Sequence, residues 1–167
     1  SGYVGGELLR LVAAHPDLEL AAAVSESCNG QPIAATFSHL SGAYGEQAFT
    51  GYDSWLDTLP EGSQLALFSA APHGSSAALI AAALEAAAGK DIEVHVVDSS
   101  ADFRYSNQLD YEVVYGNEHG APELINDFFC ALPEHVDSAD KQHVGHPGCF
   151  ATATLLATVP LVASGLA

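Results

Sequence analysis

The sharpest chemical feature of the sequence is a cysteine that follows a proline–glycine turn. Residues 146–153 read HPGCFATA, and an apolar segment without charge follows Cys149. We expect a buried helix that begins at Cys149. The unpaired N–H groups and the dipole at a helix N-terminus stabilise a thiolate, which is a nucleophile for an acyl carbon. The alternative is a small buried hydrophobic residue, the role that we expect for Cys28 and Cys130.

A polar loop carries one of the two arginines. DSSADFR, residues 98–104, follows an apolar run, IEVHVV, that is typical of a strand. The planar guanidinium of Arg104 suits bidentate binding of a carboxylate or phosphate. A surface ion pair between Asp102 and Arg104 is the alternative. We interpret Arg104 as a binding residue.

Two glycine-containing segments are candidates for contact with a dinucleotide. SGYVGG, residues 1–6, precedes a predicted helix, and APHGSS, residues 71–76, lies between a predicted strand and a helix. Glycines in such turns allow a pyrophosphate to approach the backbone and rest on a helix N-terminus. The alternative is that both are ordinary helix starts, and we expect Ser75 or Ser76 to cap the second helix in either case.

The segment that follows the second predicted strand bears on the choice of cofactor. Glu26 lies 20 residues after Gly6, where dinucleotide-binding folds place an acid that binds the ribose. Its neighbours Ser25 and Ser27 suit a 2′-phosphate better than a carboxylate does. NADP and NAD both stay open on these residues alone.

Strands and helices must alternate to position these loops. The pattern predicts helices over Glu7–Ala14, 54–59 (with Asp53 as N-cap) and Ser75–Ala88, strands over Leu18–Val24, Leu65–Ala70 and Ile92–Val97, and mostly loop over 25–51. Such alternation is typical of a doubly wound, Rossmann-like α/β domain with a mainly parallel sheet. The sequence opens in a turn and ends just after an apolar helix. We therefore expect a chain truncated at both ends that lacks the first strand of its sheet.

Composition excludes several classes of protein. With 21 Asp and Glu against 4 Lys and Arg, the 167 residues have a formal charge of −17, which argues against nucleic acid or an anionic membrane as partner. An apolar content of 49% excludes disorder. The 3 cysteines contain no CxxC pair and the 8 histidines no ligand spacing, so we expect no disulfide framework, no metal site and a cytoplasmic protein. Pro160 and the lack of basic anchors favour a buried helix over a membrane span after Cys149.

Several segments, taken in order, resemble the N-acetyl-γ-glutamyl-phosphate reductases of the semialdehyde dehydrogenase superfamily. These segments are SGYVGGELLRL, AAPHGSS, VVDSSADFR, YGNEHGAPEL, ALPEH and GHPGCFATA. The last is the most specific. Family members usually have Asn or Val before Pro-Gly-Cys and Tyr after it, where this chain has His146 and Phe150.

The resemblance implies NADPH-dependent reduction of N-acetyl-γ-glutamyl phosphate to N-acetylglutamate 5-semialdehyde and phosphate, through a thioester on Cys149, in arginine biosynthesis. The motifs and the resemblance together predict binding of NADP(H) by Ser1, Gly2, Tyr3, Val4, Gly5, Ser25, Ser27, Pro72, His73 and Gly74, and of substrate by Ser100, Arg104, Pro147 and Gly148. The family's acid/base histidine lies beyond the cysteine, and no histidine follows Cys149. We therefore expect little or no reductase activity from these 167 residues alone.

The resemblance also predicts the domain organisation. Residues 1–147 would form the NADP-binding domain, and residues 148–167 would begin an α+β substrate and dimerisation domain, which implies a homo-oligomer when the chain is complete. The expected partner is a small acyl phosphate. Aspartate-semialdehyde dehydrogenase and a reductase of a carrier-linked aminoadipyl phosphate are alternatives in the same superfamily. A non-catalytic nucleotide-binding module is the alternative from another class.

Overall fold

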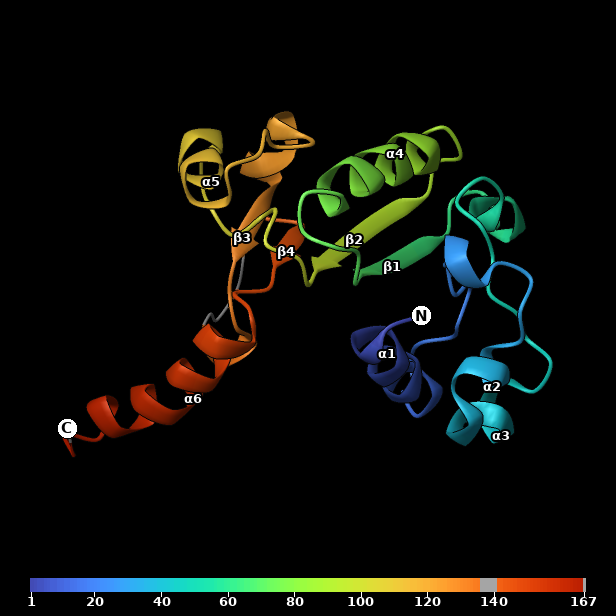
Figure 1. Cartoon of the computed structure of the whole chain (residues 1–167), viewed down its shortest axis with the longest axis horizontal. Coiled ribbons are helices and arrows are strands. Elements are labelled where there is room, and N and C mark those ends of the chain that lie inside the picture. The colour runs from blue at the N-terminus through green and yellow to red at the C-terminus, as the bar shows by residue number, and fades with distance from the viewer. Residues whose placement is uncertain (136–140, 167) are drawn as a thin grey trace. The chain divides into compact units, whose positions relative to one another are not determined.

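The chain divides into two compact units that are described separately. The computed structural model describes residues 1–135 and 141–166 (Figure 1). The first unit contains residues 1–63 and 89–92, and the second contains residues 64–88 and 93–167.

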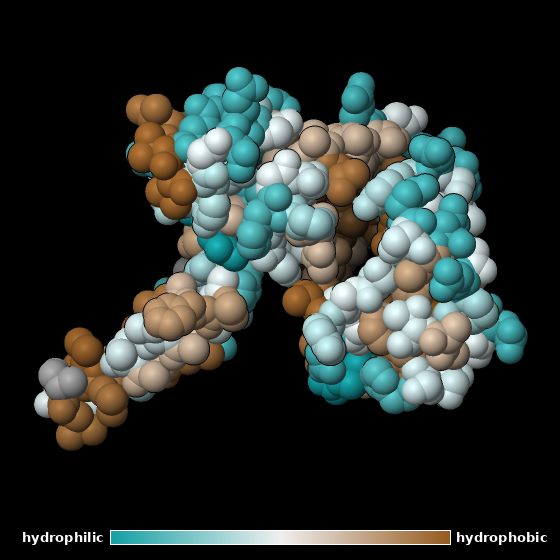
Figure 2. All heavy atoms as spheres, in the orientation of Figure 1, coloured by the Kyte–Doolittle hydropathy of each residue, from teal (hydrophilic) through white to brown (hydrophobic). Residues whose placement is uncertain are grey.

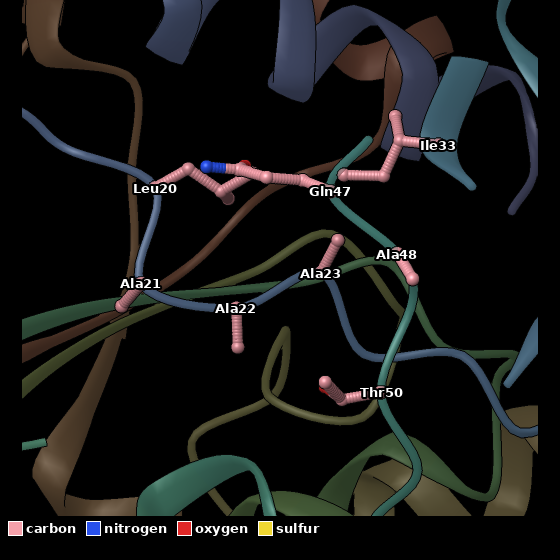
Figure 3. Close-up of a pocket in the computed structure, with 8 residues that line it drawn as sticks. All are labelled: Leu20, Ala21, Ala22, Ala23, Ile33, Gln47, Ala48 and Thr50. Atoms are coloured by element: carbon pink, nitrogen blue, oxygen red, sulfur yellow. The ribbon is translucent and has the colours of Figure 1, made fainter. Parts of the chain in front are cut away.

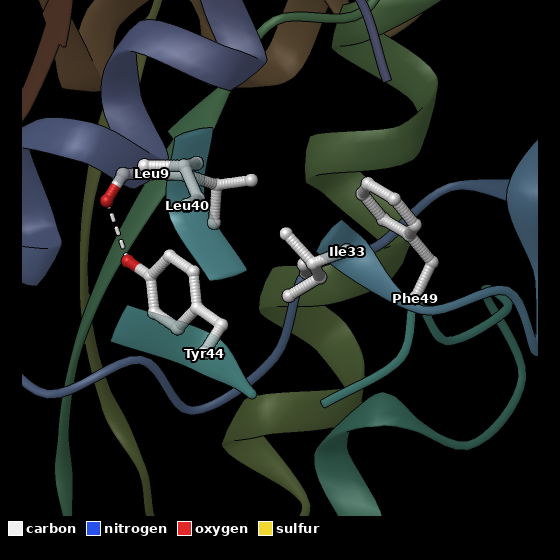
Figure 4. Close-up of a cluster of buried hydrophobic side chains, with 6 residues drawn as sticks. Leu9, Ile33, Leu40, Tyr44 and Phe49 are labelled. Carbon is white, nitrogen blue, oxygen red and sulfur yellow. Dashed lines mark hydrogen bonds between the residues drawn. The ribbon is translucent and has the colours of Figure 1, made fainter. Parts of the chain in front are cut away.

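The first unit consists of one longer helix and several short ones. These elements are α1 (Tyr3–Ala13), η1 (Glu26–Cys28), α2 (Ile33–Thr36), η2 (Ser38–Leu40), α3 (Ser41–Tyr44) and η3 (Trp55–Thr58), where η marks a 3-10 helix. Their small core contains Leu9, Ala23, Ile33, Leu40, Tyr44 and Phe49 (Figure 4). The Tyr44 hydroxyl donates a hydrogen bond to the carbonyl oxygen of Leu9, which ties α3 to α1.

The predicted strand over Leu18–Val24 is wrong. Only Val24 pairs, in an isolated parallel bridge with Thr50, because the described residues supply no ladder partner to the preceding positions. The segment from Leu20 instead lines a hollow of about 220 Å³ (Figure 3). The short helix before Pro60 is confirmed as η3, but its N-cap is Ser54 and not Asp53, and Ser54 makes no side-chain cap bond.

The second unit is built on a parallel sheet of four strands. They are β1 (Gln64–Ser69), β2 (Glu93–Asp98), β3 (Phe128–Cys130) and β4 (His143–Gly145), in the order β1-β2-β4-β3. Helix α4 (Ser76–Ala88) connects the parallel neighbours β1 and β2 (Figure 1). Buried apolar residues of the sheet and α4, among them Leu65, Ile80, Val94 and Val96, form its core. The predicted α/β, mainly parallel Rossmann-like fold is confirmed, as are both strands and the helix between them.

Further elements of the second unit have no predicted counterpart. They are β3, β4, α5 (Gln108–Tyr115), η4 (Pro122–Asp127) and η5 (Pro133–His135). Strands of three residues are too short to show the alternation by which strands are recognised.

The helix predicted at Cys149 is present as α6 (Cys149–Ala163), but its predicted burial is wrong. None of its residues is buried, and Phe150 is 86% exposed. Much of the visible surface of α6 is apolar in Figure 2. Its apolar side chains are exposed because the described residues provide little for them to pack against. Within residues 1–135 and 141–166, no helix has both the length and the apolar character needed to cross a bilayer.

Candidate active site

Three loops follow neighbouring parallel strands and meet at one edge of the sheet. β1 leads into residues 70–75, β2 into residues 99–104, and β4 into the turn before Cys149. Because parallel strands bring their carboxyl ends to one edge, ligands of open α/β sheets bind there. These loops contain the predicted cofactor residues Pro72, His73 and Gly74 and the predicted substrate residues Ser100, Arg104, Pro147 and Gly148.

The buried carboxylate of Asp98 joins the three loops. It ends β2, is 0% exposed, and accepts hydrogen bonds from the hydroxyls of Ser76 (2.7 Å) and Ser100 (2.6 Å). Ser76 also bonds the hydroxyl of Ser69 at the end of β1 (2.6 Å). The carbonyl oxygen of Asp98 accepts from the N–H of His146 (2.8 Å), three residues before Cys149. The backbone that leads to the cysteine is thereby fixed to the same residue.

A second buried carboxylate, Asp102, holds the start of α4. It accepts from the N–H groups of Gly74 (2.8 Å) and Ala77 (3.0 Å) and from the hydroxyl of Tyr111 (3.2 Å). Burial, together with the negative charge and hydrogen bond of Asp102, raises the pKa of Tyr111 to about 12, so this hydroxyl remains a donor at neutral pH. Asp102 therefore caps α4 from another loop.

Two of the predictions for these residues can now be assessed. Ser75 precedes α4 and its carbonyl oxygen accepts from the Leu79 N–H (3.3 Å), whereas the Ser76 hydroxyl bonds Ser69 and Asp98 and does not cap the helix. The surface pair of Asp102 with Arg104 is absent from the described residues, because Asp102 is only 1% exposed and its oxygens bond other groups.

Arg104 lies against the turn that precedes Cys149. Its Nε donates to the carbonyl oxygen of His146 (3.0 Å) and its Nη1 to the hydroxyl of Tyr115 (3.5 Å). A Cβ atom on Gly148 would lie 2.9 Å from the guanidinium carbon, and Gly148 has φ +97°. The positive φ favours glycine at this position, and any larger residue would also displace the Arg104 guanidinium.

Cys149 is the exposed first residue of α6. Gly148 is its N-cap and offers no side chain, and the Thr152 N–H donates to the Gly148 carbonyl oxygen (2.9 Å). Four residues before Cys149, β4 runs so close to the loop after β2 that a Cβ on Gly145 would clash with the Phe103 carbonyl oxygen. The thiol is thus presented by a closely packed turn.

The remaining candidates of these loops differ in their accessibility. Pro72, His73 and Gly74 are exposed, and the ring Nδ1 of His73 accepts from the Ala101 N–H (2.9 Å). Ser100 is 1% exposed, and its hydroxyl bonds Asp98 and the N–H of Asp102. Pro147 is half-buried.

The candidates for the phosphates of a dinucleotide lie together in the first unit. The hydroxyls of Ser1 and Ser25 lie 3.5 and 3.4 Å from that of Ser27. Gly2 is the N-cap of α1, and the following residues Tyr3, Val4 and Gly5 form its first turn. Glu26 accepts a hydrogen bond from the N–H of Tyr52 (3.2 Å).

The other two cysteines are not the buried residues that we expected. Cys28 is half-buried and Cys130 is exposed. Burial raises the pKa of the Cys130 thiol against the lowering effect of Arg104. The pKa of Cys28 is lowered, because the raising effect of desolvation is outweighed by hydrogen bonds with the hydroxyls of Ser27, Ser1, Ser25 and Thr36.

The sequence did not single out several residues that hold the loops in place, namely Asp98, Tyr111, Tyr115 and Thr152, and it named Ser76 only as a possible helix cap. One signal was present for Asp98: a carboxylate directly after the apolar run IEVHVV must be buried if the strand is central, and then needs donors nearby. For the others the sequence contains no such signal.

Comparison with known proteins agrees with this geometry. The family model for the NAD-binding domain of semialdehyde dehydrogenases matches residues 1–138. A LysW-L-2-aminoadipate/LysW-L-glutamate phosphate reductase of Aeropyrum pernix is 39% identical over 98% of the chain and 44% of its own length. N-acetyl-γ-glutamyl-phosphate reductases of Pseudomonas savastanoi and Azotobacter vinelandii are 40% and 41% identical over 100% of the chain and 46% of their own length. The chain thus spans less than half the length of these relatives.

Proposed function

The chain belongs to the semialdehyde dehydrogenase family and contains its NAD-binding domain, and from that premise we propose that the protein is an NADPH-dependent reductase of an acyl phosphate. The observation that carries the proposal is the placement of Cys149. It is exposed at the first position of α6, directly after a turn fixed by Arg104 and Asp98. The substrate that we propose is N-acetyl-γ-glutamyl phosphate, in arginine biosynthesis in the cytoplasm.

In the first step the Cys149 thiolate attacks the acyl carbon, and the bond between that carbon and the phosphate oxygen breaks. Inorganic phosphate departs, and the acyl group stays on the sulfur as a thioester. A bound NADPH would supply the hydride for reduction of this thioester to N-acetylglutamate 5-semialdehyde, with Cys149 released as the thiolate. The peptide N–H groups of the first turn of α6 point toward the end where Cys149 lies, and they stabilise negative charge there.

Arg104 is the proposed anchor for the anionic end of the substrate. Its Nε and Nη1 bond His146 and Tyr115, and the described residues leave the N–H groups of Nη2 for a carboxylate or phosphate oxygen. Pro147 and Gly148 would border the substrate next to Cys149. Ser100 is buried with its hydroxyl engaged, so we assign it to holding the loop instead of touching the substrate.

The residues of the first unit fit the phosphates of NADPH. A Cβ on Gly2 or Gly5 would meet no atom within 4 Å, so a pyrophosphate can approach the backbone at the start of α1. The hydroxyls of Ser1, Ser25 and Ser27 gather beside one another and can donate to a 2′-phosphate. The Glu26 carboxylate accepts from the Tyr52 N–H through one oxygen and keeps acceptor sites for a ribose hydroxyl, so the three serine hydroxyls alone support NADP over NAD. Tyr3 and Val4 contribute the exposed first turn of α1.

Residues 72–74 of the second unit complete the proposed cofactor contacts. Pro72, His73 and Gly74 are exposed at the carboxyl end of β1. Asp102 holds the Gly74 N–H, and the Ala101 N–H holds the His73 ring, so the loop is shaped before any ligand arrives.

The acylation step tests this proposal by itself. We expect incubation with N-acetyl-γ-glutamyl phosphate, generated in place by a kinase, to add one acyl group per chain and release phosphate. Peptide mapping should locate the group on Cys149, and the variant Cys149→Ala should stay unmodified. No adduct, or an adduct on Cys28 or Cys130, would contradict the proposal.

A second substrate has support from the relative named as a LysW-linked aminoadipate and glutamate phosphate reductase, whose identity of 39% equals that of the acetylglutamyl enzymes within a few per cent. The same assay with aspartyl phosphate and with a LysW-linked glutamyl phosphate separates the substrates. Faster acylation by either one than by N-acetyl-γ-glutamyl phosphate would reassign the substrate while leaving the role of Cys149 in place. Complete turnover is measured as phosphate-dependent oxidation of N-acetylglutamate semialdehyde, and we predict low activity for these 167 residues alone. Formation of a homo-oligomer by the complete chain also stays a prediction.

A further inference from the structure

His146 is fixed on several sides at the point where β4 gives way to the turn before Cys149. Its N–H donates to the carbonyl oxygen of Asp98 (2.8 Å), and its own carbonyl oxygen accepts from Nε of Arg104 (3.0 Å). The backbone of His146 is therefore held by the last residue of β2 and by a residue of the loop that follows it.

The ring of His146 bridges the turn and the helix. Its Nδ1 accepts from the N–H of Gly148 (3.0 Å), and its Nε2 lies 3.3 Å from the hydroxyl oxygen of Thr152. Because Nδ1 accepts an N–H, it carries no proton, and in the neutral ring the proton is on Nε2, which donates to Thr152. Burial, reinforced by the positive charge of Arg104, lowers the pKa of His146 and favours this neutral form at neutral pH.

The two residues that the His146 ring contacts lie on either side of Cys149 in the sequence. Gly148 precedes Cys149, and Thr152 lies almost one helical turn after it. The Gly148 N–H is held by the His146 ring, and the Gly148 carbonyl oxygen is held by the Thr152 N–H (2.9 Å). Both polar groups of Gly148 are thus fixed, at a residue that has no Cβ to restrict its backbone and that adopts a φ of +97°.

We propose that His146 is a positioning residue for Cys149, in which the imidazole joins the Gly148 N–H to the Thr152 hydroxyl and holds the thiol at the start of α6. The inference rests on the proposed role of Cys149 as nucleophile. It assigns His146 no contact with substrate and no transfer of a proton in the reaction. Its effect is on the fraction of time that the sulfur spends in the reactive orientation.

The test is site-resolved alkylation of Cys149 by iodoacetamide at neutral pH, with Cys28 and Cys130 in the same chain as internal controls. We expect His146→Ala to slow labelling of Cys149 about fivefold, the equivalent of one lost hydrogen bond, with the other two rates unchanged. An asparagine side chain accepts from the N–H two residues on in an Asx turn but does not reach Thr152, so His146→Asn should restore the rate to that of Thr152→Val.

Thr152→Val removes the far end of the bridge without touching the turn. We expect a smaller slowing, about twofold, and no additional slowing when it is combined with His146→Ala, because both changes act on one bridge. This variant also serves if His146→Ala fails to fold, which would appear as faster labelling of Cys28 and Cys130.

The outcomes separate this inference from the proposed function. A fast wild-type Cys149 whose rate is unchanged in His146→Ala and Thr152→Val overturns the positioning role alone. A loss in His146→Ala that His146→Asn does not restore also overturns it, because the acceptor at Gly148 would then be irrelevant. A wild-type Cys149 that labels no faster than Cys130 overturns the proposed function and this inference together.

Discussion

The two units of the chain hold their candidate functional residues in different ways. In the second unit, the buried carboxylates of Asp98 and Asp102 join the loops after β1 and β2, and the backbone carbonyl oxygen of Asp98 holds the turn after β4. In the first unit, Ser1 and Ser27 are exposed and their hydroxyls are no closer than 3.5 Å. The candidate residues of the second unit are thus held by short hydrogen bonds to buried groups, whereas the exposed hydroxyls of the first unit make only long polar contacts.

This difference matches the tasks that we propose for the two units. A covalent step requires the nucleophile at about 3 to 3.5 Å from the atom that it attacks and in the right orientation, and preorganised loops provide that position without cost at the moment of reaction. A phosphate group has several oxygens and a high charge, and it can order exposed hydroxyls as it binds. Substitutions should therefore affect stability in the second unit and affinity in the first.

The largest expected effect comes from Asp98. Its replacement in Asp98→Ala leaves the hydroxyls of Ser76 and Ser100 without their buried acceptor, which should lower the free energy of unfolding by about 3 kcal/mol. Hydrogen exchange should show the loss in the protection of β1, β2 and α4.

The matched control is Asp53→Ala, which removes an exposed carboxylate from the first unit. Its effect on the free energy of unfolding should stay within about 0.5 kcal/mol. Equal stability of Asp98→Ala and Asp53→Ala would show that the buried network of the second unit has no structural importance.

An intermediate effect is expected in the first unit, on affinity. The double variant Ser25→Ala/Ser27→Ala should weaken NADPH about tenfold through the loss of hydrogen bonds to a charged phosphate, while leaving NADH unchanged. Binding is measured by titration calorimetry, and the free energy of unfolding should not change. If the binding of NADPH and of NADH were weakened equally, the hydroxyls of Ser25 and Ser27 would not bind the 2′-phosphate.

The smallest expected effect is the response of the second unit to acid. Burial, with a smaller contribution from His95, lowers the pKa of His143 below 6.5 against the raising effect of Asp127. The unfolded chain therefore binds a proton near pH 6.5 that the folded chain resists, so stability is full above that pH and falls as the pH drops through the folded value.

The loss is measured as hydrogen exchange of β2 and β4 between pH 7 and 5.5, and we expect faster exchange at the lower pH. The variant His143→Asn can still accept the Val96 N–H that now donates to Nδ1 (3.2 Å), but it does not titrate. The variant His143→Asn should lose less stability in acid than the wild-type chain. An unchanged loss would show that other groups cause it, and His146 is then the first residue to replace.

The sequence predicts the parts of the molecule whose signals are local. Apolar runs bounded by turns gave β1, β2 and α4, and the Pro-Gly-Cys turn before an apolar segment gave the start of α6 at Cys149. The predicted strand over Leu18–Val24 failed because pairing depends on a neighbour, which no property of the segment itself supplies.

Contacts across loops were beyond the reach of the sequence. Asp102 caps α4 from 25 residues away, and Arg104 bonds the backbone 42 residues later in the chain. The burial expected for Cys130 and for α6 failed for a related reason, since an apolar side chain is buried only where other elements cover it. Residue type established what each candidate could do, and the fold decided what it touches.

The central claim, that Cys149 is the acyl nucleophile, is tested most directly by the alkylation rates of the three cysteines in the wild-type chain. Iodoacetamide near neutral pH, followed by peptide mass spectrometry, should label Cys149 far faster than the others. Cys28 should follow, because hydroxyl contacts lower its pKa, and Cys130 should be slowest, because burial raises its pKa. Equal and slow labelling of all three would contradict the claim and favour a non-catalytic nucleotide-binding module.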